Sequence, residues 1–489
     1  MSTGSTWPQR FIVLLCVAFL AGACGRLPDT AFVRESEQVR RLTVLYTNDE
    51  HGWMEATDEA GGAAGMLERW RSDHGYADDE HFLVLSGGDM WTGPAVSTLL
   101  EGRSMIDVMN RMGYAAAAVG NHDFDFGQDA LRERAEQADF PFLSANLIDR
   151  QTGHPPDYVQ AFTVREVNGV RVAIVGLTTV ETSVDTRPSY VQGLRFRRYE
   201  NTLLEVLPTV QQEEPDVILV IAHMCNQELQ GVADVAQQYG IPLLGGGHCH
   251  EEHNDPAGGT RLIESGFFLR GYVKVDMFVD IETDDVVAMD TQIWANSVGP
   301  RAPALQTRIE YYRDQLQPAV REPIGYTAGR IDRRSQLMDR LLTEAWLGAV
   351  PEARVALASR RYVQASIPPG EITPGTIVGV LPVQNELFRI QLTGEQLRTT
   401  INSRDPLLGG LIRTEDGLRF PGGEALDPDA TYEVVLPDVI YFGANYYEVQ
   451  ALDPSPTGTD LNWRDPVVEF IRDLESSRER PLDQLLGSE

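Results

Sequence analysis

A run of small apolar residues that ends in a polar cluster constrains the fold of this chain most strongly. Residues 115–119 are four alanines and a valine, and Gly-Asn-His-Asp follows them directly. Such a run has the character of a buried strand, and open α/β sheets hold their ligands at the carboxyl ends of their strands. Asn121 offers a carbonyl oxygen to a metal ion, His122 a titratable imidazole, and Asp125 a carboxylate that can orient that imidazole. We therefore expect a functional site at this strand end.

The first 290 residues alternate between short apolar runs and segments with helical character. Helices are expected at residues 61–71 and 105–112. The runs that we expect to form strands are residues 42–46, 82–85, 115–119, 141–143, 172–177, 216–222 and 241–244. Because strands that alternate with helices are typical of α/β domains, the sequence predicts an α/β domain with a largely parallel sheet.

Five of these expected strands end in residues of the types that bind metal ions. In chain order they are Asp49, His51, Asp89, Asn121, His223, His248 and His250. Carboxylate, imidazole and amide ligands suit Mn, Fe, Zn, Co or Mg, and do not suit copper(I) or an iron–sulfur cluster. Seven ligands are too many for one ion, so the set predicts two divalent metal ions with one carboxylate bridging them. The other histidines, which are expected in solvated polar loops, are His74, His81, His154 and His253.

The charge of the chain limits the partners that it can bind. Its 41 Lys and Arg residues and 72 Asp and Glu residues give a formal net charge of −31. Such a charge argues against a nucleic acid polymer as the partner and against electrostatic docking on anionic lipid. A small anionic substrate would need local positive charge, which bound metal ions can supply. No sequence feature indicates an obligate protein partner.

The first 24 residues have the pattern of a targeting segment. Arg10 precedes the apolar run 11–20, which is shorter than a membrane-spanning helix, and small residues lead from it to Cys24. Small residues before a cysteine resemble the bacterial lipoprotein processing box. We therefore expect Cys24 to carry a lipid anchor and the protein to be exported to the periplasm or the cell surface, with simple secretion as the alternative. Residues 25–39 are polar and charged, as expected for a tether.

Two of the four cysteines lie well inside the mature chain. Cys225 and Cys249 are each close in sequence to a candidate metal-ligand histidine. An exported compartment permits a disulfide between them, and two buried free thiols fit the sequence equally well.

The 489-residue chain is too long for one ordinary hydrophobic core, so two domains are expected. The first domain is expected at residues 40–299. Residues 300–323 have helical character with proline at both ends, and are expected to form a linker helix. The second domain is expected at residues 324–489.

The ordered motifs resemble those of the calcineurin-like dinuclear metallophosphoesterases, and in particular the bacterial 5′-nucleotidase and 2′,3′-cyclic phosphodiesterase family. The resemblance rests on Asn-Asp-x-His-Gly at 48–52, Gly-Asp at 88–89, Gly-Asn-His-Asp at 120–123, His223, and Gly-His-x-His at 247–250. It implies an α/β fold in which a catalytic sandwich of two sheets flanked by helices precedes a smaller α/β substrate-binding domain.

The resemblance also implies a role for each candidate residue. One metal ion would be held by Asp49, His51 and His250, and the other by Asn121, His223 and His248, with Asp89 bridging them. His122 would contact the phosphoryl oxygens of the substrate, and Asp125 would hold its ring. Manganese is the favoured metal.

The substrate pocket departs from the pattern of this family. Gln364 stands where the family has an arginine that clamps an anionic group, and Arg360 and Arg361 could replace it. Tyr441 or Phe442 could stack on a nucleobase. We therefore expect these two arginines and two aromatic residues to bind the substrate.

The resemblance implies a hydrolase that cleaves phosphate esters, above all 5′-nucleotides or related nucleotides, by attack of metal-activated water. One alternative is a thiosulfohydrolase-like dimanganese enzyme of sulfur oxidation, because that group shares the architecture. The other alternative is a non-catalytic surface binding protein. The presence of His122 with Asp125 argues against it, because a site that only binds metal does not need this pair.

Overall fold

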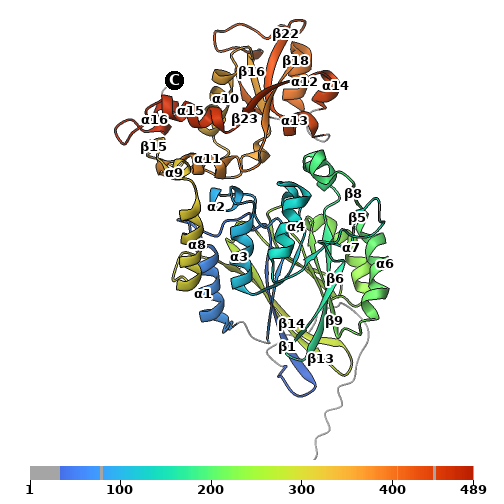
Figure 1. Ribbon diagram of the computed structural model, residues 1–489. Coiled ribbons are helices and arrows are strands. Elements are labelled where there is room, and N and C mark those ends of the chain that lie inside the picture. The colour runs from blue at the N-terminus through green and yellow to red at the C-terminus, as the bar shows by residue number, and fades with distance from the viewer. Residues whose placement is uncertain (1–32, 78–80, 405, 444–447, 488–489) are drawn as a thin grey trace, which may run out of the picture.

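The computed structural model describes residues 33–77, 81–404, 406–443 and 448–487 of the chain (Figure 1). The predicted signal segment, with the predicted lipidation site at Cys24, lies outside these residues. Within the described ranges, none of the helices combines the length and the apolar character needed to cross a bilayer.

The N-terminal domain contains two six-stranded sheets. The first has the order β14-β13-β1-β2-β3-β4, in which β1 to β4 run parallel and β13 and β14 are antiparallel additions. Its strands are β1 (Val39–Thr47), β2 (Phe82–Ser86), β3 (Tyr114–Ala118), β4 (Phe142–Leu143), β13 (Gly271–Asp280) and β14 (Asp285–Ala295).

The second sheet has the order β11-β12-β10-β9-β7-β6, with β11 and β6 as its antiparallel edges. Its strands are β6 (Phe162–Val167), β7 (Val170–Thr178), β9 (Val217–His223), β10 (Leu243–Gly245), β11 (Glu252–Ala257) and β12 (Thr260–Ser265). A separate two-stranded sheet joins β5 (Leu147–Asp149) to β8 (Leu194–Phe196).

Alternation of side chains along the strands explains why the sheets stack. Leu42 and Val44 of β1 pack against residues of the second sheet, including Leu219, whereas Leu45 faces the opposite way and packs against helices. A strand that is buried on both faces must lie between two layers. The result is a sandwich of two sheets with helices on both outer faces (Figure 1).

The helices of this domain fall into two sets. Residues of α1, α3 and α4 share the core on the outer face of the first sheet, and residues of α6 and α7 share the core on the outer face of the second. The helices are α1 (Gly62–His74), α2 (Ala95–Thr98), α3 (Arg103–Met112), α4 (Gly127–Gln137), α5 (Thr182–Asp185), α6 (Tyr199–Gln211) and α7 (Asn226–Gln238), with short 3₁₀ segments η2 (His122–Phe124) and η3 (Pro188–Val191).

The structure corrects the expectation of one largely parallel sheet. The expected strands are divided between two sheets, and each sheet carries antiparallel strands at its edges. Strand–helix alternation does not reveal which strands pair, because pairing is a long-range property. The sandwich implied by the family resemblance is confirmed.

Helices α8 (Pro303–Gln315) and α9 (Pro318–Arg321) lie between the two sheet regions of the chain. Leu305, Ile309 and Tyr312 of α8 join the core on the outer face of the first sheet. This helix is therefore packed on the N-terminal domain rather than free between domains.

The C-terminal domain is a smaller α/β unit with one core around a five-stranded sheet of order β19-β16-β22-β18-β23. Its strands are β15 (Gly325–Thr327), β16 (Val355–Ala358), β17 (Gly370–Ile372), β18 (Glu386–Thr393), β19 (Leu407–Gly409), β20 (Ile412–Thr414), β21 (Gly417–Arg419), β22 (Thr431–Pro437) and β23 (Thr457–Asn462). Its helices are α10 (Gln336–Ala349), α11 (Pro374–Val380), α12 (Gly394–Arg404), α13 (Asp438–Phe442), α14 (Val449–Leu452), α15 (Asp465–Asp473) and α16 (Leu482–Gly487), with the 3₁₀ segment η4 (Arg360–Tyr362).

The two domains contact each other directly. Val378 of α11 packs into the N-terminal core beside α2, and Arg187 donates a hydrogen bond of 2.6 Å to Asp438 Oδ2 of α13. The C-terminal domain sits above the sandwich in Figure 1, with α11 close to α2. The C-terminal domain thereby covers the loops that follow the parallel strands.

We expect Leu219→Ala to lower the free energy of unfolding of the N-terminal domain by about 2–5 kcal/mol, because it leaves a cavity between the two sheets. Leu219 is fully buried, whereas Leu204 on α6 is 42% exposed. Leu204→Ala is the matched control, and its effect should stay within about 0.5 kcal/mol. Urea unfolding followed by tryptophan fluorescence measures both, and equal losses would contradict the assigned core.

Candidate metal centre

The structure brings all seven predicted ligands together at the carboxyl ends of strands from both sheets. They come from the loops after β1, β2, β3 and β10, and from the end of β9. The ligand atoms of Asp49, His51 and His250 lie within 4.8 Å of one another, and so do those of Asp89, His223 and His248. Asn121 Oδ1 is 3.1 Å from His223 Nε2, which places it with the second group.

Asp89 lies between the two groups. Its Oδ2 is 3.0 Å from His223 Nε2 in one group and 3.6 Å from His51 Nε2 in the other. Burial would raise the pKa of this carboxyl, but the neighbouring histidines His223 and His122 hold it well below its usual value. The carboxylate is therefore ionised and in reach of both groups.

Backbone carbonyls orient two of the histidine rings toward the centre. His51 Nδ1 donates a 2.8 Å hydrogen bond to Thr92 O, and His223 Nδ1 donates a 2.9 Å hydrogen bond to Gly87 O. When Nδ1 carries the proton, Nε2 keeps its lone pair, so each ring presents a ligand atom to the centre. These buried rings and carboxylates fit the donor set of a dinuclear site for divalent metals.

The backbone at the centre is strained. A left-handed conformation is uncommon for residues other than glycine, and such residues gather at functional sites. Five of the seven predicted ligands have positive φ: Asp49 (51°), His51 (46°), Asp89 (59°), His248 (75°) and His250 (58°). At Gly120, a Cβ would collide with the Asp89 carboxylate, so only glycine permits this close approach.

His122 and Asp125 form a pair beside the centre. His122 Nδ1 and Asp125 Oδ2 are 2.8 Å apart, and the His122 backbone N–H donates to Asp89 Oδ1 at 2.8 Å. Burial would lower the pKa of His122, but the charges of Asp125 and Asp89 outweigh it and raise the pKa to about 10. In the metal-free protein this imidazole is therefore positively charged at neutral pH.

Several supporting residues were not assigned a role from the sequence. Asp123 accepts hydrogen bonds from the backbone N–H groups of Asp89, Met90 and Gly120, at 3.1, 2.8 and 2.8 Å. Asn48 donates to Asp49 Oδ2 at 2.7 Å. Both residues stand inside the motifs beside predicted ligands, which is the signal that could have identified them.

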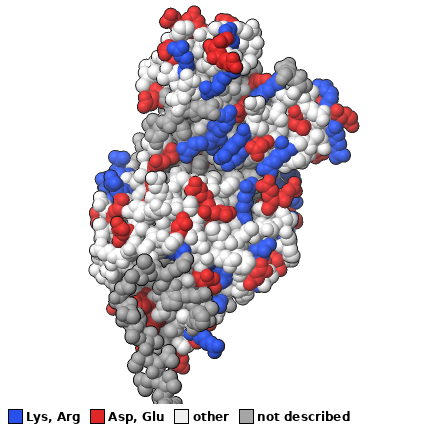
Figure 2. Space-filling view, turned by 180° about the vertical axis from the view of Figure 1, so that it is seen from behind, with Lys and Arg blue, Asp and Glu red and all other residues white. Residues whose placement is uncertain are grey.

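The centre opens into a cavity of about 460 Å³ between the two domains. Its C-terminal lining includes Arg333, Arg334, Arg361, Tyr362 and Gln364. Burial, followed by the charges of Arg334 and Arg270, lowers the pKa of Arg333, so positive charges crowd this wall. An anion in the cavity would relieve that repulsion. On the face in Figure 2, Lys and Arg side chains gather where the domains meet.

The structure separates the four predicted substrate residues. Arg361 lines the cavity, but Arg360 next to it forms an ion pair with Asp339 inside the C-terminal domain. Phe442 is 44% exposed and lines a narrow slot that adjoins His122 and Asp125. Tyr441 is buried and its hydroxyl donates to Asp453 O at 3.0 Å, so its side chain belongs to the core.

Four other histidines were expected in solvated polar loops, and two of them lie in a helix or a strand instead. His81 and His154 are exposed, as expected. His74 lies at the end of α1, with its Nε2 2.7 Å from the Tyr272 hydroxyl. His253 lies on β11, between Glu251 and Asp255. Tyr272, the partner of His74, is far from it in sequence, whereas Glu251 and Asp255 are each only two residues from His253.

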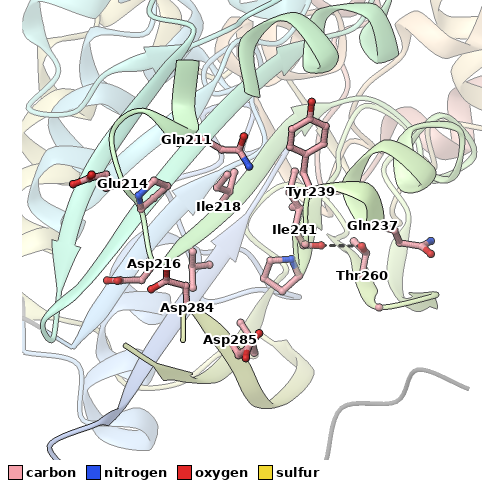
Figure 3. Close-up of a pocket in the computed structure, with 16 residues that line it drawn as sticks. Gln211, Glu214, Asp216, Ile218, Gln237, Tyr239, Ile241, Thr260, Asp284 and Asp285 are labelled. Carbon is pink, nitrogen blue, oxygen red and sulfur yellow. Dashed lines mark hydrogen bonds between the residues drawn. The ribbon is translucent and has the colours of Figure 1, made fainter. Parts of the chain in front are cut away.

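A larger hollow of about 940 Å³ lies at the other end of β9 (Figure 3). Its lining includes Glu214, Asp216, Asp284 and Asp285. It contains none of the predicted site residues, and its acidic wall is unsuited to an anionic substrate.

Cys225 and Cys249 form a disulfide. The sequence was compatible with either a disulfide or two buried free thiols, and the structure contains the disulfide. Disulfides are typical of proteins in oxidising, extracytoplasmic compartments.

Comparison with known proteins agrees with this geometry. Residues 323–451 match the family model described as the 5′-nucleotidase C-terminal domain. A 5′-nucleotidase of Vibrio vulnificus (strain CMCP6) is 25% identical, with 95% of this chain and 96% of that protein covered.

Two solved structures share the fold. The 5′-nucleotidase precursor of Thermus thermophilus matches with a TM-score of 0.76 and 19% identity, over 90% of this chain and 97% of that one. The sulfate thiohydrolase SoxB of Thermus thermophilus matches with a TM-score of 0.73 and 18% identity, over 91% and 95%. The C-terminal domain match, the nearly full-length relative and the candidate dinuclear centre agree, and the chain is similar to 5′-nucleotidases over nearly its whole length.

Proposed function

We propose that this protein is an exported metallophosphoesterase that hydrolyses 5′-nucleotides or related phosphate esters. The observation that carries the proposal is that the Asp89 carboxylate lies within reach of histidines from both groups of candidate ligand atoms. In the proposed assignment Asp89 bridges two metal ions, one held by Asp49, His51 and His250 and the other by Asn121, His223 and His248. Residues 40–299 would form the catalytic domain and residues 324–489 the substrate-binding domain.

Two divalent ions, with manganese favoured, would supply the Lewis acidity that polarises a phosphate ester and lowers the pKa of water. The protein's own contribution begins with orientation. Hydrogen bonds from Nδ1 to backbone carbonyls fix the His51 and His223 rings, and buried carboxylates balance the charge of the cations.

His122 would stabilise the charge that develops on the phosphoryl oxygens. Its imidazole, which is charged in the metal-free protein, adjoins the predicted ligand Asn121 and lines both the cavity and the slot. Asp125 holds the ring through Nδ1 and thereby directs Nε2 away from that carboxylate. A positioned cation that matches developing negative charge is among the largest contributions to catalysis.

The cavity and the slot support a substrate with an anionic part and a polar leaving group. Arg333, Arg334 and Arg361 provide positive charge in the cavity. In the slot, Asn385 Nδ2 and Asp438 Oδ1 are buried and have no hydrogen-bond partner among the described residues. This donor and acceptor suit hydroxyl or amide groups such as those of a nucleoside.

The targeting of the protein is part of this proposal. We expect the segment 1–24 to direct export and Cys24 to provide a lipid anchor. The Cys225–Cys249 disulfide supports an oxidising location.

The first test is phosphate release by protein lacking residues 1–24, with Mn²⁺ added. We expect turnover of nucleoside monophosphates to exceed that of an aryl phosphate, because a nucleoside can form hydrogen bonds with Asn385 and Asp438 of the slot and an aryl ring cannot. Chelation of the metal should abolish activity. Turnover of the aryl phosphate alone would refute the nucleotide assignment. Release of sulfate from a thiosulfonate, without phosphate release from any ester, would favour the thiosulfohydrolase alternative.

His122→Ala should reduce kcat by about 10²–10⁴-fold while two metal ions stay bound, because the residue provides charge and not a metal ligand. Metal content by mass spectrometry and steady-state kinetics measure the two effects separately. His154→Ala, at an exposed histidine, is the control and should retain activity. Loss of metal in His122→Ala would contradict the assigned role.

Arg361→Ala should raise KM for nucleotides by about 10-fold, because one charged contact to the substrate is lost. Arg360→Ala is the neighbouring control: it should leave KM unchanged and lower the melting temperature, since Asp339 loses its ion-pair partner. Kinetics and thermal melting of both variants test the side-chain directions. A larger KM effect in Arg360→Ala would show that the roles are reversed.

A further inference from the structure

The disulfide lies among three of the predicted metal ligands. Cys225 follows His223 by two residues, and Cys249 stands between His248 and His250. The Cα atoms of the two cysteines are 5.1 Å apart. His223 and His248 belong to one group of ligand atoms and His250 to the other. One covalent bond is therefore adjacent to ligands of both groups.

The two ends of the bridge are held very differently. Cys225 is the N-cap residue of α7, and its backbone N–H donates to Glu228 Oε2 at 3.2 Å. Leu229 and Val232 of α7 are fully buried in the core against the second sheet. The Cys225 end is thus fixed to a packed helix.

The Cys249 end belongs to an irregular loop after the three-residue strand β10. His248 and His250, on either side of Cys249, both have positive φ, a conformation that is unfavourable for residues other than glycine. The loop is tied back by Gly247 N–H to Met224 O at 3.0 Å, and by His248 N–H to Asp49 Oδ2 at 3.0 Å. Strained backbone persists only where the surroundings determine it, and the disulfide adds a covalent restraint at that point.

We propose that the Cys225–Cys249 disulfide positions residues for metal binding by holding the loop with His248 and His250 beside His223. The inference rests on the proposed function, because it assumes that these histidines bind metal. Without the bridge the loop can relax its two left-handed residues, and both groups of ligands lose a member. Since disulfides persist in oxidising compartments, full metal affinity is tied to such a compartment.

The test is metal binding by the serine pair Cys225→Ser and Cys249→Ser in protein lacking residues 1–24. After removal of metal by a chelator, Mn²⁺ binding is measured by calorimetry, and metal content after equilibrium dialysis. We expect two ions in the parent protein and about 10–100-fold weaker binding of both in the serine pair, as is usual when groups that orient ligands are removed. Measurements are made at a temperature where all variants are folded.

Val232→Ala is the matched control, because it weakens the core under α7 and leaves the bridge intact. It should lower the melting temperature and leave both Mn²⁺ dissociation constants unchanged. A parallel loss of affinity in this control would show that stability, and not positioning, governs metal binding. Such a result would overturn the inference.

A second measurement does not depend on folding of the variant. A phosphine reductant transfers two electrons to the disulfide and takes oxygen from water, giving two thiols and a phosphine oxide. Folded parent protein treated in this way should also bind Mn²⁺ more weakly, because this hard cation favours oxygen and imidazole over sulfur. A thiol reagent confirms that two thiols have appeared.

The outcomes separate the two proposals. A parent protein that binds no pair of ions refutes the proposed function. A parent and a bridge-free protein that bind two ions equally well refute the inference and leave the proposed function standing. Weaker binding of only one ion also contradicts the inference, because the bridge lies beside ligands of both groups.

Discussion

The placement of one buried carboxylate, that of Asp89, is the constraint on which the site depends. Its Oδ2 lies within reach of both His51 and His223, and its Oδ1 accepts a hydrogen bond from the backbone N–H of His122. An ionised carboxylate is costly to bury unless partners surround it. Here the partners come from the loops after β1 and β3 and from the end of β9, and β9 belongs to a different sheet from β1 and β3. Stabilising the buried charge of Asp89 therefore depends on residues from both sheets.

The stacking of the two sheets makes this convergence possible. Hydrogen bonds between the sheets secure their carboxyl ends: Tyr46 donates to Gly246 O at 2.6 Å, and Asn48 Oδ1 accepts from Ser265 N–H at 2.7 Å. These bonds join the end of β1 to the loop after β10 and to the last residue of β12. Candidate ligands from both sheets thereby lie close together.

The parts of the site that the sequence predicted are those carried by local motifs. The seven ligands, His122 and Asp125 each follow an apolar run, and a strand that ends in polar residues has a recognisable local pattern. The fold class followed from strand–helix alternation and the family resemblance. The division into two mixed sheets did not follow from them, because β13 and β14 complete the first sheet from a distant part of the chain.

The sequence also did not predict in which direction the side chains of the second domain point. Arg360 and Arg361 are adjacent in η4, yet Arg360 pairs with Asp339 and Arg361 lines the cavity. The sequence alone does not show which of two neighbours in a helical turn faces a binding site.

The domain interface also resolves a conflict between the overall charge and the proposed substrate. A chain with a net charge of −31 repels phosphate esters at long range, so binding depends on positive charge concentrated at short range. The C-terminal domain supplies this charge through Arg333, Arg334 and Arg361, directly opposite the ligands of the N-terminal domain. Neither domain alone forms the cavity. Contacts between the domains, such as that of Arg187 with Asp438, therefore hold these arginines beside the candidate metal ligands.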